Sequence, residues 1–164
     1  METTDKIELF GIIAHNQCEH VEDLYKFTRD TFGEPKLHIA EAAVLAMDKA
    51  CEMDDNFNDK LTTLTIVAMT GYKFYNEISA NQIANVMTDL YARKNADYGN
   101  SFDESLDKFG IIAAMVRISD KVNRLKRLVI NPKEAQVKDE SIADTYIDLA
   151  NYAVMTIMWK QNGK

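Results

Sequence analysis

The C-terminal part of the sequence carries a row of side chains that could hold a cation. Glu140, Asp144, Asp148 and Asn151 follow one another at spacings of four, four and three residues, so they share one face of a helix. That face borders an apolar row, which places the acids half-buried beside Ala143, Ile147, Ala150 and Val154. Carboxylates at this spacing repel one another, and partial burial strengthens the repulsion. We therefore expect a positive charge next to the acidic row.

A second charged face lies earlier in the chain. Arg117, Asp120, Lys121 and Arg124 also recur at helical spacing. Two interpretations of the two faces remain open. In the first, the basic side chains pair with the acidic row across two antiparallel helices, as a salt-bridge ladder. In the second, the acids bind a divalent cation, for which oxygen ligands favour Mg²⁺ or Mn²⁺, and the basic side chains hold nucleotide phosphates that also reach the metal.

The segment KNADYGNSFDE, at 94–104, joins two expected helices. Its Gly-Asn pair predicts a turn, and Ser101 followed three residues later by Glu104 predicts a capping box that starts the next helix. Neither feature requires the other polar and aromatic side chains of the segment. Lys94, Asp97 and Tyr98 therefore stay without a local explanation.

The elements that position these residues are helices. Two prolines and six glycines leave few places to break a helix, and strand-like alternation is absent from the sequence. We expect the clearest helix from Phe102 to Ile130 and the last from about Asp139 to Gln161, with Ser79 as the cap of an earlier one. The sequence thus predicts an all-α bundle of about six helices.

The composition limits the classes of function. The net charge of −7 argues against a general nucleic-acid binder, because neutralising phosphates needs a basic face. No apolar run reaches the roughly 20 residues that span a membrane, and the N-terminal segment lacks the positive charge of a secretion signal. We therefore expect a cytoplasmic protein with no membrane partner. The broad apolar surface of the last helix predicts a homo-oligomer.

Three motifs occur in the order KNADYGNSF, RISDKVNRLKRL and DESIADTYIDLANYAV. Together they resemble the phage-associated family called nucleotide modification associated domain, over about residues 86–160. The resemblance implies a role in nucleotide metabolism in the cytoplasm of a bacterial host. We accordingly divide the chain into an N-terminal helical segment, 1–80, packed on a nucleotide modification associated helical domain, 81–164. The layout is also distantly similar to MazG-like all-α nucleoside triphosphate pyrophosphatases, which hold Mg²⁺ on acidic pairs from neighbouring helices.

Our leading hypothesis from the sequence is a Mg²⁺-dependent nucleoside triphosphate pyrophosphohydrolase. In it, Glu140 and Asp144 are catalytic and hold the metal together with Asp148 and Asp120. Tyr98 stacks on the base, and further side chains bind the nucleotide: Lys94, Asp97, Asn100, Arg117, Lys121 and Arg124. Two alternatives stay open. One is a nucleotide-binding or signal-sequestering module without catalysis, and the other is a structural bundle with an internal salt-bridge ladder.

Overall fold

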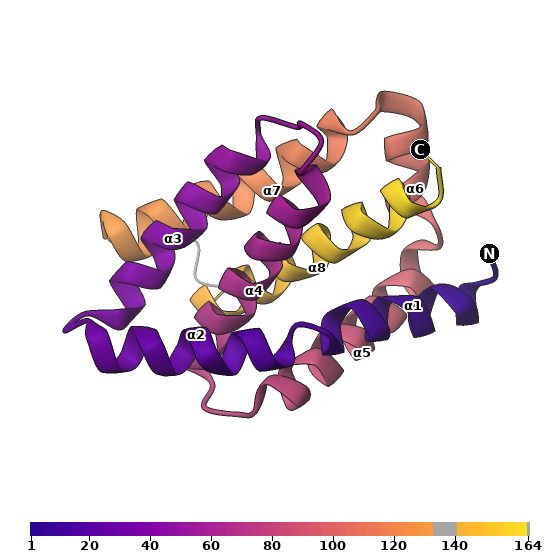
Figure 1. Cartoon of the computed structure of the whole chain (residues 1–164). Coiled ribbons are helices and arrows are strands. Elements are labelled where there is room, and N and C mark those ends of the chain that lie inside the picture. Colours follow the sequence, from indigo (N-terminus) through magenta and orange to yellow (C-terminus); the bar gives the residue numbers. More distant parts are fainter. Residues whose placement is uncertain (133–140, 164) are drawn as a thin grey trace.

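The chain folds into helices, as a computed structural model shows for residues 1–132 and 141–163 (Figure 1). Within those ranges the structure has no strand, so the all-α prediction is confirmed, with more helices than the expected six. The helices are α1 (Thr3–His15), α2 (Cys18–Thr31), α3 (Pro35–Ala50), α4 (Phe57–Tyr75), α5 (Ala80–Tyr98), α6 (Ser101–Phe109), α7 (Ile112–Leu125), the π-helical turn η1 (Lys126–Ile130) and α8 (Ile142–Gln161). No helix in the described ranges is long and apolar enough to cross a membrane.

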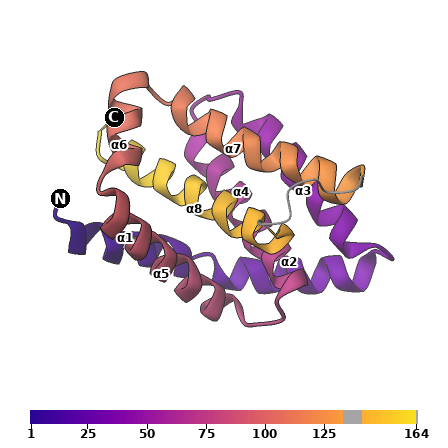
Figure 2. The same cartoon turned by 180° about the vertical axis from the view of Figure 1, so that it is seen from behind.

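The expected long helix from Phe102 to Ile130 is wrong, because the chain breaks at Gly110. This glycine has φ of 77°, a left-handed value that side chains rarely adopt, and it ends α6. Helix α7 then begins at Ile112 in a new direction. The break lets α6 fold back toward the end of α8, where both views show the two helices meeting (Figures 1 and 2).

Serine caps start two of the helices. Ser79 accepts a hydrogen bond from the backbone N–H of Gln82 at the start of α5, which confirms it as a cap. Ser141 does the same at the start of α8, where its partner is Asp144. The capping box expected at Ser101 is wrong. The N-cap of α6 is Asn100, one residue before the expected Ser101, and no side chain forms a capping hydrogen bond there.

Helix α8 lies in the middle of the bundle and packs against α1, α4, α5, α6 and α7 (Figure 1). Its tightest seam is with α4. There Gly71 of α4 faces Tyr146 of α8, which is wholly buried, and a methyl group at Gly71 would overlap the tyrosine ring. One hydrophobic core joins side chains from α1 to α5 with those of α7 and α8. Residues 1–80 therefore share a core with the C-terminal helices.

A smaller hydrophobic cluster holds α6. It consists of Phe102 and Leu106 of α6, Ala114 of α7 and Trp159 of α8. The indole N–H of Trp159 also donates a hydrogen bond to the Asp107 carboxylate at 2.9 Å. Helix α6 is thus fixed to the end of the bundle by contacts of its own.

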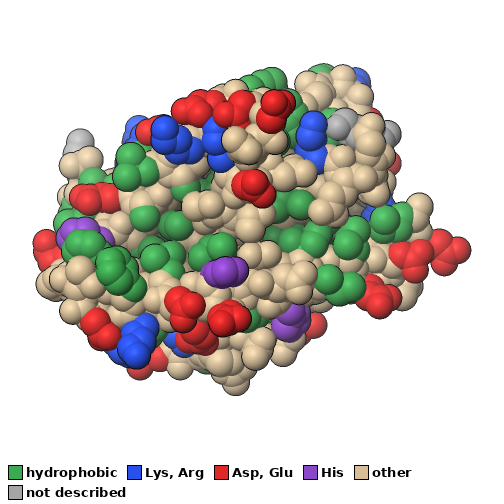
Figure 3. Space-filling model, viewed as in Figure 1, with side chains coloured by type: hydrophobic (Ala, Val, Ile, Leu, Met, Phe, Trp, Pro, Cys, Tyr) green, Lys and Arg blue, Asp and Glu red, His purple; other side chains and the backbone are tan. Residues whose placement is uncertain are grey.

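The surface is acidic, as the net charge of −7 requires. Acidic side chains occupy several separate parts of the face drawn in Figure 3. The basic side chains of the candidate site lie on α1, α5 and α7.

Candidate nucleotide-binding site

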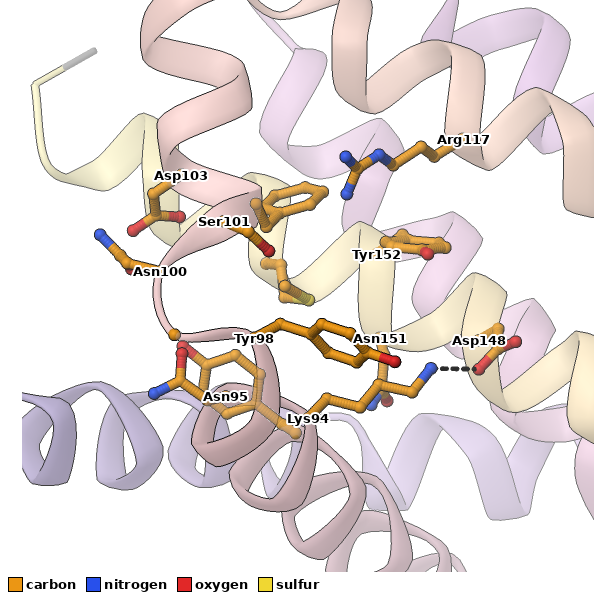
Figure 4. Close-up of a pocket in the computed structure, with 14 residues that line it drawn as sticks. Lys94, Asn95, Tyr98, Asn100, Ser101, Asp103, Arg117, Asp148, Asn151 and Tyr152 are labelled. Carbon is orange, nitrogen blue, oxygen red and sulfur yellow. Dashed lines mark hydrogen bonds and ion pairs between the residues drawn. The ribbon is translucent and has the colours of Figure 1, made fainter.

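Two helices turn matching rows of side chains toward one pocket of about 380 Å³ (Figure 4). Each row uses spacings of three, one and three residues, so all its members lie on one helical face. The α5 row is Tyr91, Lys94, Asn95 and Tyr98, and the α8 row is Asp148, Asn151, Tyr152 and Met155. The α5–α6 turn, the first residues of α6 and Arg117 of α7 complete the wall. The pocket therefore brings together residues as far apart in the sequence as Tyr91 and Met155.

Helix α1 fixes the edge of this pocket. The Lys6 ammonium donates hydrogen bonds to Asn100 Oδ1 at 2.6 Å and Asp103 Oδ2 at 2.8 Å. Its side chain is only 12% exposed, so solvent screens the contact with Asp103 little. Lys6 thereby joins Asn100, the N-cap residue of α6, to Asp103 in the first turn of that helix. Sequence reasoning missed Lys6, since no local pattern links it to a turn about 95 residues away.

Asp148, one acid of the predicted row, contacts two cations. It lies 3.3 Å from the Lys94 ammonium through Oδ1 and 3.1 Å from the Lys121 ammonium through Oδ2. One turn away, Arg124 Nε donates to Thr145 Oγ1 at 3.3 Å. The residue numbers rise along α8 as they fall along α7, so the two helices are antiparallel. One rung of the expected ladder, Lys121 with Asp148, is therefore present.

The other predicted metal ligands do not gather around Asp148. Asp144 is exposed at the start of α8, where its carboxylate accepts the backbone N–H of Ser141 at 3.4 Å. Asp120 is exposed on α7, and Glu140 lies outside the described residues. Among the residues that are described, no group of three or more histidine, cysteine or acidic side chains could hold a metal ion. The Mg²⁺ site stays a prediction.

Arg117 stands between the pocket and a second concavity. Its guanidinium lies 5.4 Å from the centre of the Phe102 ring and 6.0 Å from that of Tyr152, and it donates to Ser105 Oγ at 3.3 Å. No carboxylate in the described part of the chain forms an ion pair with it. The second concavity, a groove of about 330 Å³, adjoins the pocket through shared walls and is lined by Arg117, Asp120, Lys121, Arg124 and Tyr152. The structure thus brings the predicted basic face together in one groove, which we call the cationic groove.

The predicted contacts on α5 divide into two groups. Tyr98, 71% exposed, and Lys94 both line the pocket, as Asn100 does on the turn. Asp97 is exposed and does not line the pocket. Tyr91 lies deeper, where burial, reinforced by the charge of Asp103, raises the pKa of its phenol to about 12. Tyr91 therefore stays neutral over the whole physiological pH range.

A family model described as nucleotide modification associated domain 1 matches residues 94–159. This segment is a nucleotide modification associated domain. It runs from the last turn of α5 through most of α8 and contains every residue that lines the pocket except Tyr91. Comparisons with curated proteins and with solved structures found no match.

Asn151 of this domain is a pocket residue that the sequence placed in the acidic row without giving it a role. Its Nδ2 donates a hydrogen bond to the backbone carbonyl of Met87 at 3.2 Å. Because a carbonyl can only accept, this bond fixes the orientation of the amide. The opposite atom, Oδ1, is buried and has no hydrogen-bond partner among the described residues. The only sequence signal was its place in the helical row, next to Asp148.

Proposed function

We propose that the nucleotide modification associated domain of this chain binds a nucleotide, with the base in the pocket and the phosphates in the cationic groove. The observation that carries the proposal is that these two concavities adjoin and share Arg117 and Tyr152. A nucleotide needs such a pair of neighbouring surfaces, one aromatic and polar without excess charge, and the other cationic.

The chemistry of each concavity supports this division. In the pocket, Tyr91, Tyr98 and Tyr152 offer aromatic faces for a base, while Lys94 with Asp148 and Lys6 with Asp103 largely cancel each other's charge. In the cationic groove, the side chains of Arg117, Lys121 and Arg124 line the wall together with Asp120, and Lys121 also contacts Asp148. Arginine binds phosphate oxygens in a bidentate manner, and Arg117 has no acidic partner in the described ranges that a phosphate would have to displace.

Thermal unfolding in the presence of nucleotides tests the binding proposal. A ligand that binds the folded state alone raises the Tm by mass action, so we expect at least one of the common ribo- and deoxyribonucleoside triphosphates to stabilise the protein. Tyr98→Ala should leave the Tm of the free protein nearly unchanged, because Tyr98 is largely exposed, and should abolish the shift. The control is Phe109→Ala, which removes an equally exposed ring, 66% accessible, outside the pocket. The absence of any shift with all these nucleotides contradicts the proposal.

A second candidate function, hydrolysis of the bound nucleotide, is favoured by Asp120. This carboxylate lines the cationic groove, yet no ion pair joins it to the three cations there in the described part of the chain. A free carboxylate beside the proposed phosphate site is a candidate ligand for Mg²⁺. The described residues form no cluster of three or more metal-ligating side chains around this carboxylate.

Pyrophosphate release separates hydrolysis from simple binding. If the chain is a pyrophosphohydrolase, the protein releases pyrophosphate from a nucleoside triphosphate only when Mg²⁺ or Mn²⁺ is added. Asp120→Asn should then abolish turnover while the nucleotide still raises the Tm. A nucleotide that stabilises the protein but is never cleaved, with either metal, identifies a binding module without catalysis.

A further inference from the structure

Two buried side-chain atoms on α8 have no hydrogen-bond partner among the described residues. They are the phenol oxygen of Tyr146 and Oδ1 of Asn151. Both atoms have lost their contact with water, and nothing in the described protein replaces it. Their surroundings differ, however, because Tyr146 lies in the core against α4, whereas Asn151 lines the pocket.

The orientation of Asn151 leaves Oδ1 available as an acceptor. The amide nitrogen is occupied by the Met87 carbonyl at 3.2 Å, so the side chain cannot turn over without losing that bond. In Figure 4 the side chain of Asn151 extends from α8 toward Lys94 and α5. Lys94 is half-exposed and reaches across to Asp148, one helical turn before Asn151. Because the Lys94 side chain is half-exposed, its ion pair with Asp148 costs little to break when a ligand enters.

We propose that Asn151 Oδ1 accepts a hydrogen bond from an N–H group on the polar edge of the nucleobase, and so determines which bases the pocket accepts. This inference rests on the proposed nucleotide binding. A phosphate does not fit this position, because both of its neighbours on α8, Asp148 Oδ1 and Asn151 Oδ1, are acceptors that repel phosphate oxygens. A base edge does fit, because the surrounding side chains of Tyr91, Tyr98 and Tyr152 are aromatic.

A site whose buried acceptor must be satisfied by its ligand rejects a ligand that lacks the donor. Such rejection is much stronger than the discrimination obtained from one methylene group, because the unpaired acceptor is left desolvated. Asn151 should therefore contribute to affinity more than to stability. Replacing a residue whose role is structural would instead lower the stability of the free protein more than its affinity for the nucleotide.

The first test compares three proteins: wild type, Asn151→Leu and Tyr146→Phe. Each variant removes one unpartnered oxygen from α8, one at the pocket and one in the core. The dissociation constants for dATP, dCTP, dGTP and dTTP are measured by calorimetry, and the Tm of each free protein by thermal unfolding. We expect free Tyr146→Phe to be at least as stable as wild type. Free Asn151→Leu should differ little from wild type, because it loses the bond to the Met87 carbonyl together with the unpartnered oxygen. Asn151→Leu should weaken the best of these nucleotides by tenfold or more, and Tyr146→Phe should leave its affinity unchanged.

The second test uses wild-type protein and does not depend on the folding of a variant. The preferred nucleotide is compared with an analogue in which methyl groups replace its base N–H donors, such as N3-methyl-dTTP for dTTP. A loss of affinity of tenfold or more for the analogue supports the proposal. Equal affinity of Asn151→Leu and wild type, or of the nucleotide and its methylated analogue, overturns it while nucleotide binding stands. If wild type binds no nucleotide at all, both the inference and the proposed function fail.

Discussion

The two faces of α8 have opposite properties, although they belong to one continuous helix. On the face toward α4, Tyr146 fills the space above Gly71 so completely that a single methyl group has no room. On the face toward α5, Asp148, Asn151 and Tyr152 surround a pocket of about 380 Å³. The filled face supplies close packing against α4, which leaves the open face to carry polar groups around the pocket. The candidate site therefore lies on a helix whose opposite face packs closely against α4.

The largest expected effect is on the filled face. Gly71→Ala forces the wholly buried Tyr146 ring and α4 apart, and overpacking of this kind costs about 1–3 kcal/mol. We expect an overpacking cost near the upper end of this range. The better helix propensity of alanine offsets about 1 kcal/mol of this loss in the free energy of unfolding. The Tm should fall by about 4–8 °C.

Gly11→Ala is the matched control for Gly71→Ala. It makes the same change inside a helix, but the added methyl would meet Thr88 at an ordinary 3.6 Å. Only the gain in helix propensity remains, so the Tm should rise slightly. If Gly71→Ala is as stable as Gly11→Ala, then the α4–α8 seam is not filled and the contrast between the two faces is wrong.

The next largest effect is at the pocket, where we expect a substitution to weaken nucleotide binding and to leave the stability of the free protein nearly unchanged. Arg117→Gln removes the cation shared by the pocket and the cationic groove, and a hydrogen bond to a charged group is worth about 1.5–3 kcal/mol. We expect nucleotide affinity to fall by about 10- to 100-fold, as measured by calorimetry, with little change in Tm. Arg127→Gln, at an exposed cation on η1 that lines neither concavity, should change neither quantity.

The smallest effect distinguishes two acids one turn apart on α8. Asp148→Ala takes a partner from Lys121 and Lys94 at a half-buried position, so we expect a loss of about 1–2 kcal/mol in urea unfolding. Asp144→Ala removes only an exposed helix cap, at a cost of about 0.3–1 kcal/mol. A larger loss for Asp144 than for Asp148 would show that the salt-bridge ladder extends to the start of α8 and would remove the distinction drawn between these acids.

Periodicity predicted the parts of the site that depend on a single helix. Helical spacing placed Arg117 and Lys121 on one face of α7, where both line one groove, and the all-α fold followed from the same patterns. The failures came where the outcome depends on contacts between helices. An isolated glycine such as Gly110 does not show whether it continues or ends a helix, because its backbone permits both.

Long-range contacts decided the remaining features, and no local pattern could reveal them. Lys6 reaches the pocket only because α1 packs along α5. Helix α6 has its N-cap at Asn100, one residue before the expected cap at Ser101, and Lys6 contacts this end of the helix. The missing partner of Asn151 is a property of the packed structure as well, since in the unfolded chain its amide is solvated like any other.

The break at Gly110 also divides the bundle thermodynamically. Helix α6 depends on its own small cluster around Phe102, Leu106 and Trp159, separate from the main core. Elements with few buried contacts open locally at a lower free energy than the whole protein unfolds. We expect the backbone amides of α6 to exchange with solvent deuterium earlier than those of α4 and α8. One wall of the pocket can then open while the bundle behind it stays folded.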